Sequence, residues 1–143
     1  MPVSVSVMFD GNCREAVSFY ADVFEQECPA FLTYAQGGAL PNPDFQVSGS
    51  MQSRVRQAVV HIGGTPVRFC DTPEAFCFSH GSGVALTLTY ENPQEARIIF
   101  DRLSKGGSVD IPFQQTQDGK YYGLVEDQFR VSWVIQASGE GRA

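Results

Sequence analysis

The sequence predicts an α+β fold built from two β-α-β-β-β modules. Three observations support this prediction. The chain has 143 residues, 43% of them hydrophobic, which suits one compact domain or two very small ones sharing a core. A strand-then-helix pattern occurs twice, with its cap residues Asn12 and Asn92 lying 80 positions apart. Each predicted helix is followed by strand-like segments with glycine-containing turns between them.

The first strand-helix unit opens the chain. Residues 3–9 alternate apolar and small polar side chains, which predicts a strand. A helix is expected over about 13–25, with Asn12 as its cap and Glu15 three residues later, in the relation of a capping box. Its apolar stripe has helical spacing and comprises Ala16, Val17, Tyr20, Val23 and Phe24.

The second unit repeats these signals. A strand is predicted over 84–90, and Asn92 is again the expected helix cap. Pro93 suits the first helical position, Glu95 lies three residues after the cap, and Gly106-Gly107 are expected to end the helix. The apolar stripe is Ala96, Ile99, Phe100 and Leu103.

The remaining strands complete each module. The predicted strands are 28–36, 55–62 and 66–70 in the first module, and 108–116, 120–126 and 129–136 in the second. Gly63-Gly64 and Asp118-Gly119 are hairpin signals. Residues 37–54 are rich in Gly, Pro, Ser and Asn and are expected to form a mobile loop. The expected organisation is one domain over 1–137, with module 1 at about 1–72, module 2 at about 83–137 and a flexible tail at 138–143.

Charge and composition exclude several classes of partner. The formal net charge is −6, from ten basic and sixteen acidic residues, which argues against nucleic acid or an anionic membrane surface as a partner. No stretch has the length of a membrane span, and the N-terminus lacks the pattern of a signal peptide. We therefore expect a cytoplasmic protein whose four cysteines are reduced thiols.

Two segments resemble a known family. The opening stretch FDGNCREAVSFYADVF and the closing stretch DQFRVSWVI, Asp127 to Ile135, resemble the PhnB-like branch of the vicinal oxygen chelate superfamily, which has the glyoxalase/bleomycin-resistance/dioxygenase fold. In the closing signature, Arg130 stands where the branch usually has glycine, which is expected to alter the turn. The resemblance covers residues 1–136.

The resemblance implies that each sheet curls into a cup and that metal-using members place four ligands in it. The corresponding positions here are Val5, Ala85 and Val134, with a fourth within 67–71, where Cys70 or Asp71 alone could bind a metal. Aliphatic side chains cannot coordinate an ion, because divalent metals need imidazole, thiolate or carboxylate ligands. We therefore expect no metal at this site and no cofactor.

Other groups with possible chemistry have simpler explanations. His61 is expected at a strand end, and His80 in a solvated Ser/Gly linker. Cys70, Cys77 and His80 match no common zinc spacing. Cys13 follows a helix cap, where the helix dipole lowers a thiol pKa, so that it could be reactive, although an incidental role is the more common one.

The aromatic side chains are more informative for a ligand site. We expect Trp133 to pack as core under a helix, because it shares a face with Val131 and Ile135. Alternation allows only one of Tyr121 and Tyr122 to face the cup. The complete set of cup candidates is Tyr34, Phe69, Gln114, Tyr121 or Tyr122, Arg130 and Ser132. Such a cup suits a small, partly apolar ligand, although the same side chains could instead simply fill the barrel.

The main functional hypothesis is a metal-free small-molecule binding protein that forms a homodimer. One alternative is a metal-dependent lyase, isomerase or dioxygenase of the superfamily. Another is a drug-sequestering protein, because an acidic chain attracts cationic compounds. Some members of the branch carry a demethylubiquinone methyltransferase label, but the sequence lacks a glycine-rich strand-to-helix loop for a nucleotide-type cofactor.

Overall fold

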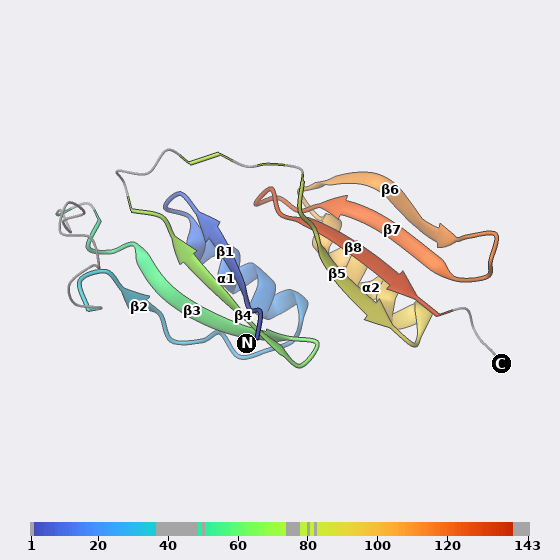
Figure 1. The fold of residues 1–143 in the computed structure, drawn as a ribbon, viewed down its shortest axis with the longest axis horizontal. Coiled ribbons are helices and arrows are strands. Elements are labelled where there is room, and N and C mark those ends of the chain that lie inside the picture. Colours follow the sequence, from blue (N-terminus) through green and yellow to red (C-terminus); the bar gives the residue numbers. More distant parts are fainter. Residues whose placement is uncertain are drawn as a thin grey trace. The chain divides into compact units, whose positions relative to one another are not determined.

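The first module has one helix packed on a mixed sheet (Figure 1). The computed structural model describes residues 2–36, 49, 51–73, 78–79, 81 and 83–138. The chain divides into two compact units, Met1–Ser79 and His80–Ala143. The elements of the first unit are β1 (Val5–Phe9), α1 (Cys13–Val23), β2 (Leu32–Thr33), β3 (Val55–Ile62) and β4 (Thr65–Asp71), and its sheet order is β1-β4-β3-β2.

The core of the first module lies between α1 and one face of this sheet. β1 pairs in parallel with β4, and Val7 is opposite Phe69. The Phe69 ring stacks on Phe9 and on Tyr20 of α1, with ring centroids 6.3 and 5.2 Å apart. Because strand side chains alternate, the opposite face of the sheet carries a separate set of residues, including Met8, Arg68 and Cys70. We call this the open face of the module.

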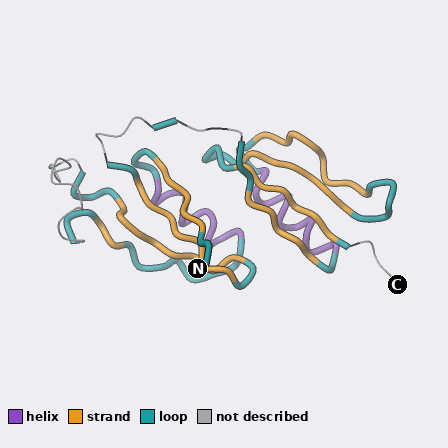
Figure 2. The backbone as a smooth tube through the Cα atoms, in the orientation of Figure 1, coloured by secondary structure: helices purple, strands orange, loops and turns teal. Residues whose placement is uncertain are grey.

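The second module has the same architecture. Its elements are β5 (Leu86–Tyr90), α2 (Pro93–Ser104), β6 (Ser108–Gln115), β7 (Tyr121–Glu126) and β8 (Ser132–Ala137), in the sheet order β5-β8-β7-β6. Figure 2 shows α2 against one face of this sheet. Phe100 of α2 packs on Phe113, with centroids 5.7 Å apart, and a Cβ on Gly123 would lie 2.7 Å from the Phe100 ring. Glycine on β7 therefore allows the helix to approach closely.

The predicted α+β fold with two β-α-β-β-β modules is confirmed. Gly63 and Gly64 both have positive φ, 60° and 82°, as a two-residue hairpin turn requires. The second hairpin turns through Thr116–Lys120 with Gly119 at φ 86°. The Asn92 side chain caps α2 by accepting hydrogen bonds from the backbone N–H groups of Gln94 and Glu95, at 2.7 and 3.3 Å.

Three predicted details are wrong. The strand predicted over 28–36 is only Leu32–Thr33, with Pro29, which has no N–H group to donate, before it. β8 begins at Ser132 rather than 129, because residues 127–130 form a turn. Asn12 makes no side-chain cap hydrogen bond among the described residues; a carboxylate from β4 accepts the N–H groups at the start of α1 instead. Most of the predicted loop 37–54 and the tail beyond Ser138 lie outside the described residues.

The two modules differ by one residue between the first strand and the helix. Phe9 and Tyr90 end the two first strands, 81 positions apart, while the helix caps Asn12 and Asn92 are 80 apart. Gly11, at φ 97°, lies in the longer connection. An alignment on the helices therefore assigns the residues of β1 to the wrong face of the sheet, because a shift of one residue exchanges the two faces of a strand.

The closing signature forms a tight turn around Asp127. The buried Asp127 carboxylate accepts hydrogen bonds from Phe129 N, Val131 N and the indole Nε1 of Trp133, at 2.8, 3.1 and 2.8 Å. Trp133 and Ile135 are fully buried, which confirms the core role predicted for Trp133. Arg130 has φ 72°, the left-handed conformation that glycine adopts without strain. The turn is thus formed despite the arginine.

Replacing Arg130 with glycine is expected to stabilise the protein by about 0.5–1 kcal/mol. Relief of left-handed strain contributes about 1–2 kcal/mol, and the larger entropy of glycine in the unfolded chain offsets part of it. The ion pair of Arg130 with Glu126, at 3.4 Å, involves a side chain that is 65% exposed and contributes little. Urea denaturation of Arg130→Gly measures the change. Arg130→Ala is the control, since it removes the same ion pair but keeps the strain, and equal stability of the two variants would contradict the explanation.

Among the described residues, no helix is long and apolar enough to cross a membrane.

Candidate functional site

The open face of the second module carries a row of polar side chains across all four strands. Thr89 of β5 is opposite Gln136 of β8, Gln136 is opposite Tyr122 of β7, and Tyr122 is opposite Gln114 of β6. Residues opposite each other on adjacent strands point to the same side of a sheet. The row therefore forms a continuous polar line on the face turned away from α2.

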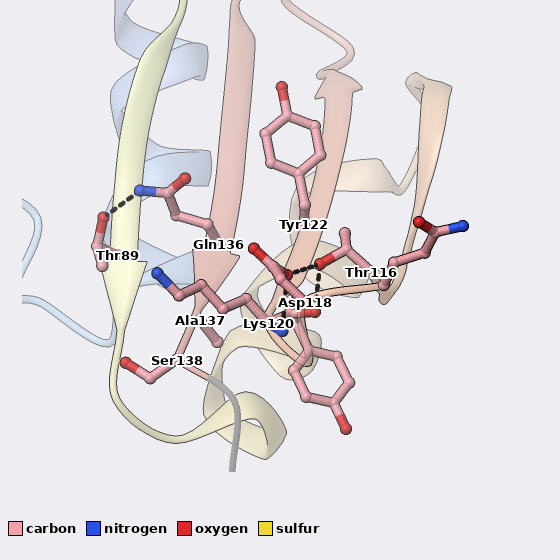
Figure 3. A pocket seen from close by; sticks show the side chains of 10 residues that line it. Thr89, Thr116, Asp118, Lys120, Tyr122, Gln136, Ala137 and Ser138 are labelled. Carbon is pink, nitrogen blue, oxygen red and sulfur yellow. Dashed lines mark hydrogen bonds between the residues drawn. The ribbon is translucent and has the colours of Figure 1, made fainter. Parts of the chain in front are cut away.

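A pocket of about 680 Å³ lies at this end of the sheet (Figure 3). Its strand residues are Thr89, Tyr121, Tyr122, Gln136 and Ala137. Its turn residues are Thr116, Gln117, Asp118 and Lys120, and Ser138 follows β8. The volume falls in the range of small-molecule sites, and most of the lining side chains can donate or accept hydrogen bonds.

Hydrogen bonds hold the walls of the pocket in place. Gln136 Nε2 donates to Thr89 Oγ1 at 2.9 Å, which fixes the amide across two strands. On the turn, the Asp118 carboxylate accepts from the Thr116 hydroxyl and from the backbone N–H of Lys120. These two hydrogen bonds, that of Thr116 first, lower the pKa of Asp118 below its usual value. Asp118 is therefore an ionised acceptor that stabilises the turn.

Apolar side chains lie next to the polar row. Val134 is opposite both Thr87 and Leu124, and Leu124 is opposite Ile111. Ile111 is 38% exposed, and Val134 and Leu124 are half-buried. The open face thus offers an apolar strip directly beside a hydrogen-bonding one, which is the pattern of a site for a partly apolar molecule.

The structure brings Gln114 and Tyr122 together in the polar row. Tyr121 lines the pocket from the opposite face of β7, where its ring stacks on Phe113 at 5.8 Å, so of the two tyrosines Tyr122 faces the open side. Ser132 also lies on the open face, opposite Glu126 and two residues from Val134 along β8. Arg130 lies in the turn before β8, beyond the polar row.

Two cup candidates of the first module are wrong. Phe69 is fully buried between β4 and α1, so its ring belongs to the core. Tyr34 is 6% exposed, and its hydroxyl donates to the carbonyl oxygen of Asp71 at 2.7 Å. Burial is the main cause that raises the Tyr34 pKa. Both aromatic rings stabilise the first module rather than offering a surface to a ligand.

Three of the four positions that the resemblance assigns to metal ligands, Val5, Ala85 and Val134, have no coordinating side chain. Val5 is opposite Val67 on the face packed against α1, so the open-face position of the first strand is Ser4 or Ser6. Ala85 and Val134 have no coordinating atom in their side chains, and Arg68 has the place on β4 that Val134 has on β8. Within the described part of the chain, no three His, Cys, Asp or Glu side chains lie close enough together to hold a metal.

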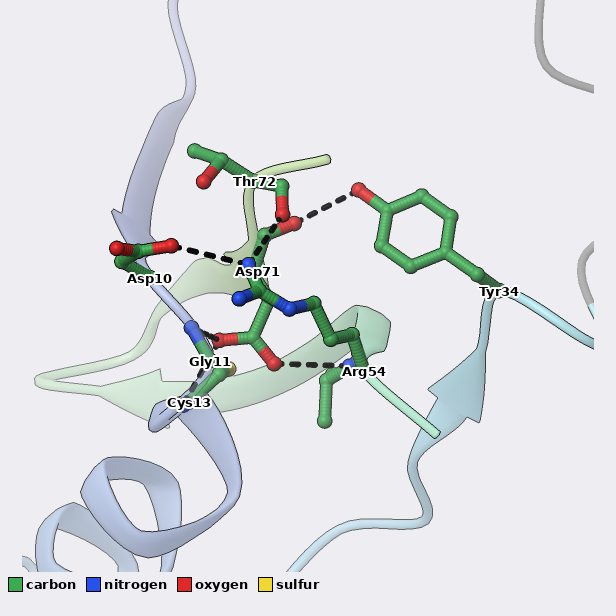
Figure 4. A network of polar contacts seen from close by, with 8 residues as sticks. Asp10, Gly11, Cys13, Tyr34, Arg54, Asp71 and Thr72 are labelled. Carbon is green, nitrogen blue, oxygen red and sulfur yellow. Dashed lines mark hydrogen bonds and ion pairs between the residues drawn. The ribbon is translucent and has the colours of Figure 1, made fainter. Parts of the chain in front are cut away.

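Asp71 points away from the open face into a polar network (Figure 4). Its Oδ1 accepts hydrogen bonds from Gly11 N and Cys13 N at 2.8 and 3.0 Å, and its Oδ2 accepts from Val55 N at 2.9 Å. Arg54 donates to the carboxylate of Asp10 and to the carbonyl of Thr72, at 3.1 and 2.9 Å. The network joins the start of α1 to the ends of β3 and β4 and is structural.

Of the two roles considered for Cys13, the structure favours the incidental one over a reactive thiol. The side chain is fully buried. Burial first, and then the nearby Asp71 carboxylate, raise the pKa of the Cys13 thiol far above its usual value, and this outweighs the dipole of α1. His61 is exposed on β3, and Cys77 and His80 lie outside the described residues.

Several pocket residues were missed from the sequence: Thr89, Thr116, Asp118, Lys120, Gln136 and Ser138. Alternation along β8 could have found Gln136, which shares a face with Val134. The pairing of Gln136 with Thr89 and Tyr122 can be predicted only when the strand order is known, because Thr89 is far from the other two residues in the chain.

Comparisons with known proteins agree with this fold. A family model described as 3-demethylubiquinone-9 3-methyltransferase matches residues 2–136. Protein YjdN of Escherichia coli K12 is 27% identical over 139 residues, covering 94% of each chain. The solved structure of PA1353 from Pseudomonas aeruginosa has a TM-score of 0.79 at 24% identity, covering 96% of this chain and 98% of that one.

Two further solved structures share this fold. A Bacillus cereus protein described as a putative 3-demethylubiquinone-9 3-methyltransferase, PhnB protein, has a TM-score of 0.72 at 24% identity, covering 96% of this chain and 98% of its own. A glyoxalase-related enzyme from Fulvimarina pelagi has a TM-score of 0.58 at 15% identity, covering 96% and 89%. The chain therefore belongs to the family described as 3-demethylubiquinone-9 3-methyltransferase.

Proposed function

We propose that the protein binds a small organic molecule in the pocket on the open face of the second module, without a metal ion. The observation that carries this proposal is that Thr89, Gln136 and Tyr122 of the polar row line the pocket, with the apolar strip of Val134 and Leu124 next to it on the same face. A ligand bound there satisfies hydrogen-bonding groups at one end and covers aliphatic carbon at the other. The absence of coordinating side chains at Ala85 and Val134 supports binding without an ion.

The methyltransferase description of the family does not itself supply a reaction for this chain. A methyl transfer needs a bound donor molecule, and neither module has a glycine-rich loop opening its helix, since α1 follows Asp10-Gly11-Asn12 and α2 follows Glu91-Asn92. The pocket supports binding, and the proposal is limited to that function.

The test is a ligand screen on metal-depleted protein. A library of small organic acids, alcohols, amines and cationic drugs is screened by thermal shift, because a ligand that binds the folded state raises its Tm. Hits are expected to lose most of their affinity in Tyr122→Ala and Gln136→Ala. The control is Gln128→Ala, an exposed glutamine of the same module that is not part of the pocket wall. Hits that bind all three variants equally would contradict the proposed site.

Metal content provides the second measurement. Protein purified without chelator is expected to contain no stoichiometric metal and to show no tight binding when titrated with Zn²⁺, Ni²⁺, Mn²⁺ or Fe²⁺. Tight stoichiometric binding would overturn the metal-free proposal in favour of a metal-dependent lyase, isomerase or dioxygenase. Binding confined to cationic drugs would favour the drug-sequestering alternative.

We also propose a homodimer located in the cytoplasm. The edge strands β1 and β5 support the dimer, because their outer sides have no neighbouring strand in their own sheets. The free thiols of Cys13, Cys28 and Cys70 support this location, because disulfides are rare in the cytoplasm.

A further inference from the structure

We propose that the pocket selects a small organic anion, a carboxylate or similar group on a partly apolar body, with Lys120 as its charge partner. The inference rests on the proposed function of the same pocket and adds the class of ligand. It begins from the position of Lys120, which directly precedes β7. Strand alternation places Lys120 on the same side as Tyr122, and therefore on the open face.

The Lys120 side chain extends over the pocket. Figure 3 shows it crossing in front of Ala137, with its end towards Thr89 and Gln136. Lys120 is the one basic residue in the pocket wall. Within the part of the chain that the structure describes, its ammonium group makes no ion pair or hydrogen bond, and its charge is a minor cause of the lowered pKa of the exposed Asp118.

The acidic residue of the pocket is already engaged. The Asp118 carboxylate accepts hydrogen bonds from the Thr116 hydroxyl and from the backbone N–H of Lys120. These hydrogen bonds hold the carboxylate against the turn. The Asp118 side chain is fully exposed at the tip of the hairpin, where water screens its charge. The attraction between Asp118 and the Lys120 charge lowers the Asp118 pKa less than these hydrogen bonds do, so an anionic ligand competes for Lys120 with a carboxylate that is screened by water and held by the turn.

The neighbouring side chains complete the site for an anion. Tyr122 has a phenol that can donate a second hydrogen bond, and Gln136 is held beside it by Thr89. Leu124 is two residues along β7 from Tyr122 on the same face, so an apolar ligand body lies on Leu124 and Val134 while its anionic group reaches Lys120. The positions of Lys120 at one end and of Leu124 and Val134 at the other predict both the charge and the orientation of the ligand.

The test uses three probes that share one ring and differ in charge: benzoate, benzyl alcohol and benzylammonium. Binding is followed by the amide shifts of Tyr122, Gln136 and Ser138 in ¹⁵N-labelled protein at constant ionic strength. We expect benzoate to bind about tenfold or more tightly than benzyl alcohol, since a charge-assisted hydrogen bond is about twice as strong as a neutral one. Added salt is expected to weaken benzoate alone.

The chain contains two lysines, Lys105 and Lys120, which provides a matched control. Lys120→Met is expected to weaken benzoate about tenfold and to leave benzyl alcohol within about twofold. Lys120→Arg is expected to restore most of the benzoate affinity. Lys105→Met removes the same charge at the end of α2, away from the pocket, and is expected to change nothing.

Tighter binding of benzylammonium, no benzoate binding at all, or equal benzoate affinity in Lys120→Met would each overturn this inference. The proposed function fails separately, when library hits bind Tyr122→Ala and Gln136→Ala as tightly as they bind the wild-type protein. A pocket that binds benzyl alcohol and benzoate equally keeps the proposed function and removes the charge preference.

Discussion

Replacing Asp71 with alanine is expected to lower the free energy of unfolding by about 3–5 kcal/mol. The side chain is 1% exposed, and its two oxygens accept the backbone N–H groups of Gly11, Cys13 and Val55. The substitution leaves these donors without acceptors, and a buried unsatisfied polar group costs about 1–3 kcal/mol. Urea denaturation followed by circular dichroism measures the change.

The control is Asp10→Ala. Asp10 pairs with Arg54 at 3.1 Å, but its side chain is 57% exposed, so the expected loss is below about 1 kcal/mol. Asp71→Asn keeps one carboxamide oxygen but directs an NH₂ group at a backbone donor. Its stability is expected to lie between those of Asp71→Ala and Asp10→Ala. A loss below about 1 kcal/mol for Asp71→Ala would show that water replaces the carboxylate at this position.

Replacing Asp127 with alanine is expected to destabilise the protein by about 3 kcal/mol. The carboxylate, on a residue that is 2% exposed, accepts from Phe129 N, Val131 N and the fully buried Trp133 indole. Its loss removes charge-assisted hydrogen bonds and leaves the indole N–H buried without this acceptor. The matched control is Asp110→Ala on the exposed side of β6, which is expected to change stability by less than about 0.5 kcal/mol.

A double-mutant cycle isolates the bond between Asp127 and Trp133. Trp133→Phe removes the indole N–H while keeping an aromatic ring in the core. In the Asp127→Ala background, Trp133→Phe is expected to cost about 1–2 kcal/mol less than in the wild type, because the bond is already absent. Additive losses would mean that the 2.8 Å contact contributes nothing to stability.

Local sequence patterns predicted the elements whose stabilising contacts are near in the chain. Asn92 caps α2 through donors two and three residues away, and the turn glycines 63, 64 and 119 have the positive φ that their hairpins need. The core role of Trp133 followed from the alternation along β8. In each case the interacting groups lie within a few residues, so propensity and periodicity determine the outcome.

Patterns failed where a distant residue replaced a local one. Asn12 has the same signature as Asn92, yet the donors at the start of α1 bind the carboxylate of Asp71, 58 residues away from Cys13. A charged acceptor forms the stronger hydrogen bond and leaves the Asn12 side chain without a capping role. Cys13 likewise follows a helix start, but the core that buries it outweighs the helix dipole.

The sequence by itself determined the α+β class and the two β-α-β-β-β modules and indicated the family, because these depend on repeated local periods and on signatures at the two ends of the chain. The tertiary structure decided which side chains share a face. One added residue near Gly11 sets the face of Val5, and the strand order brings Thr89, Gln136, Tyr122 and Gln114 into one row. Both depend on pairing between strands far apart in the chain, where a shift of one residue exchanges the buried and the open face.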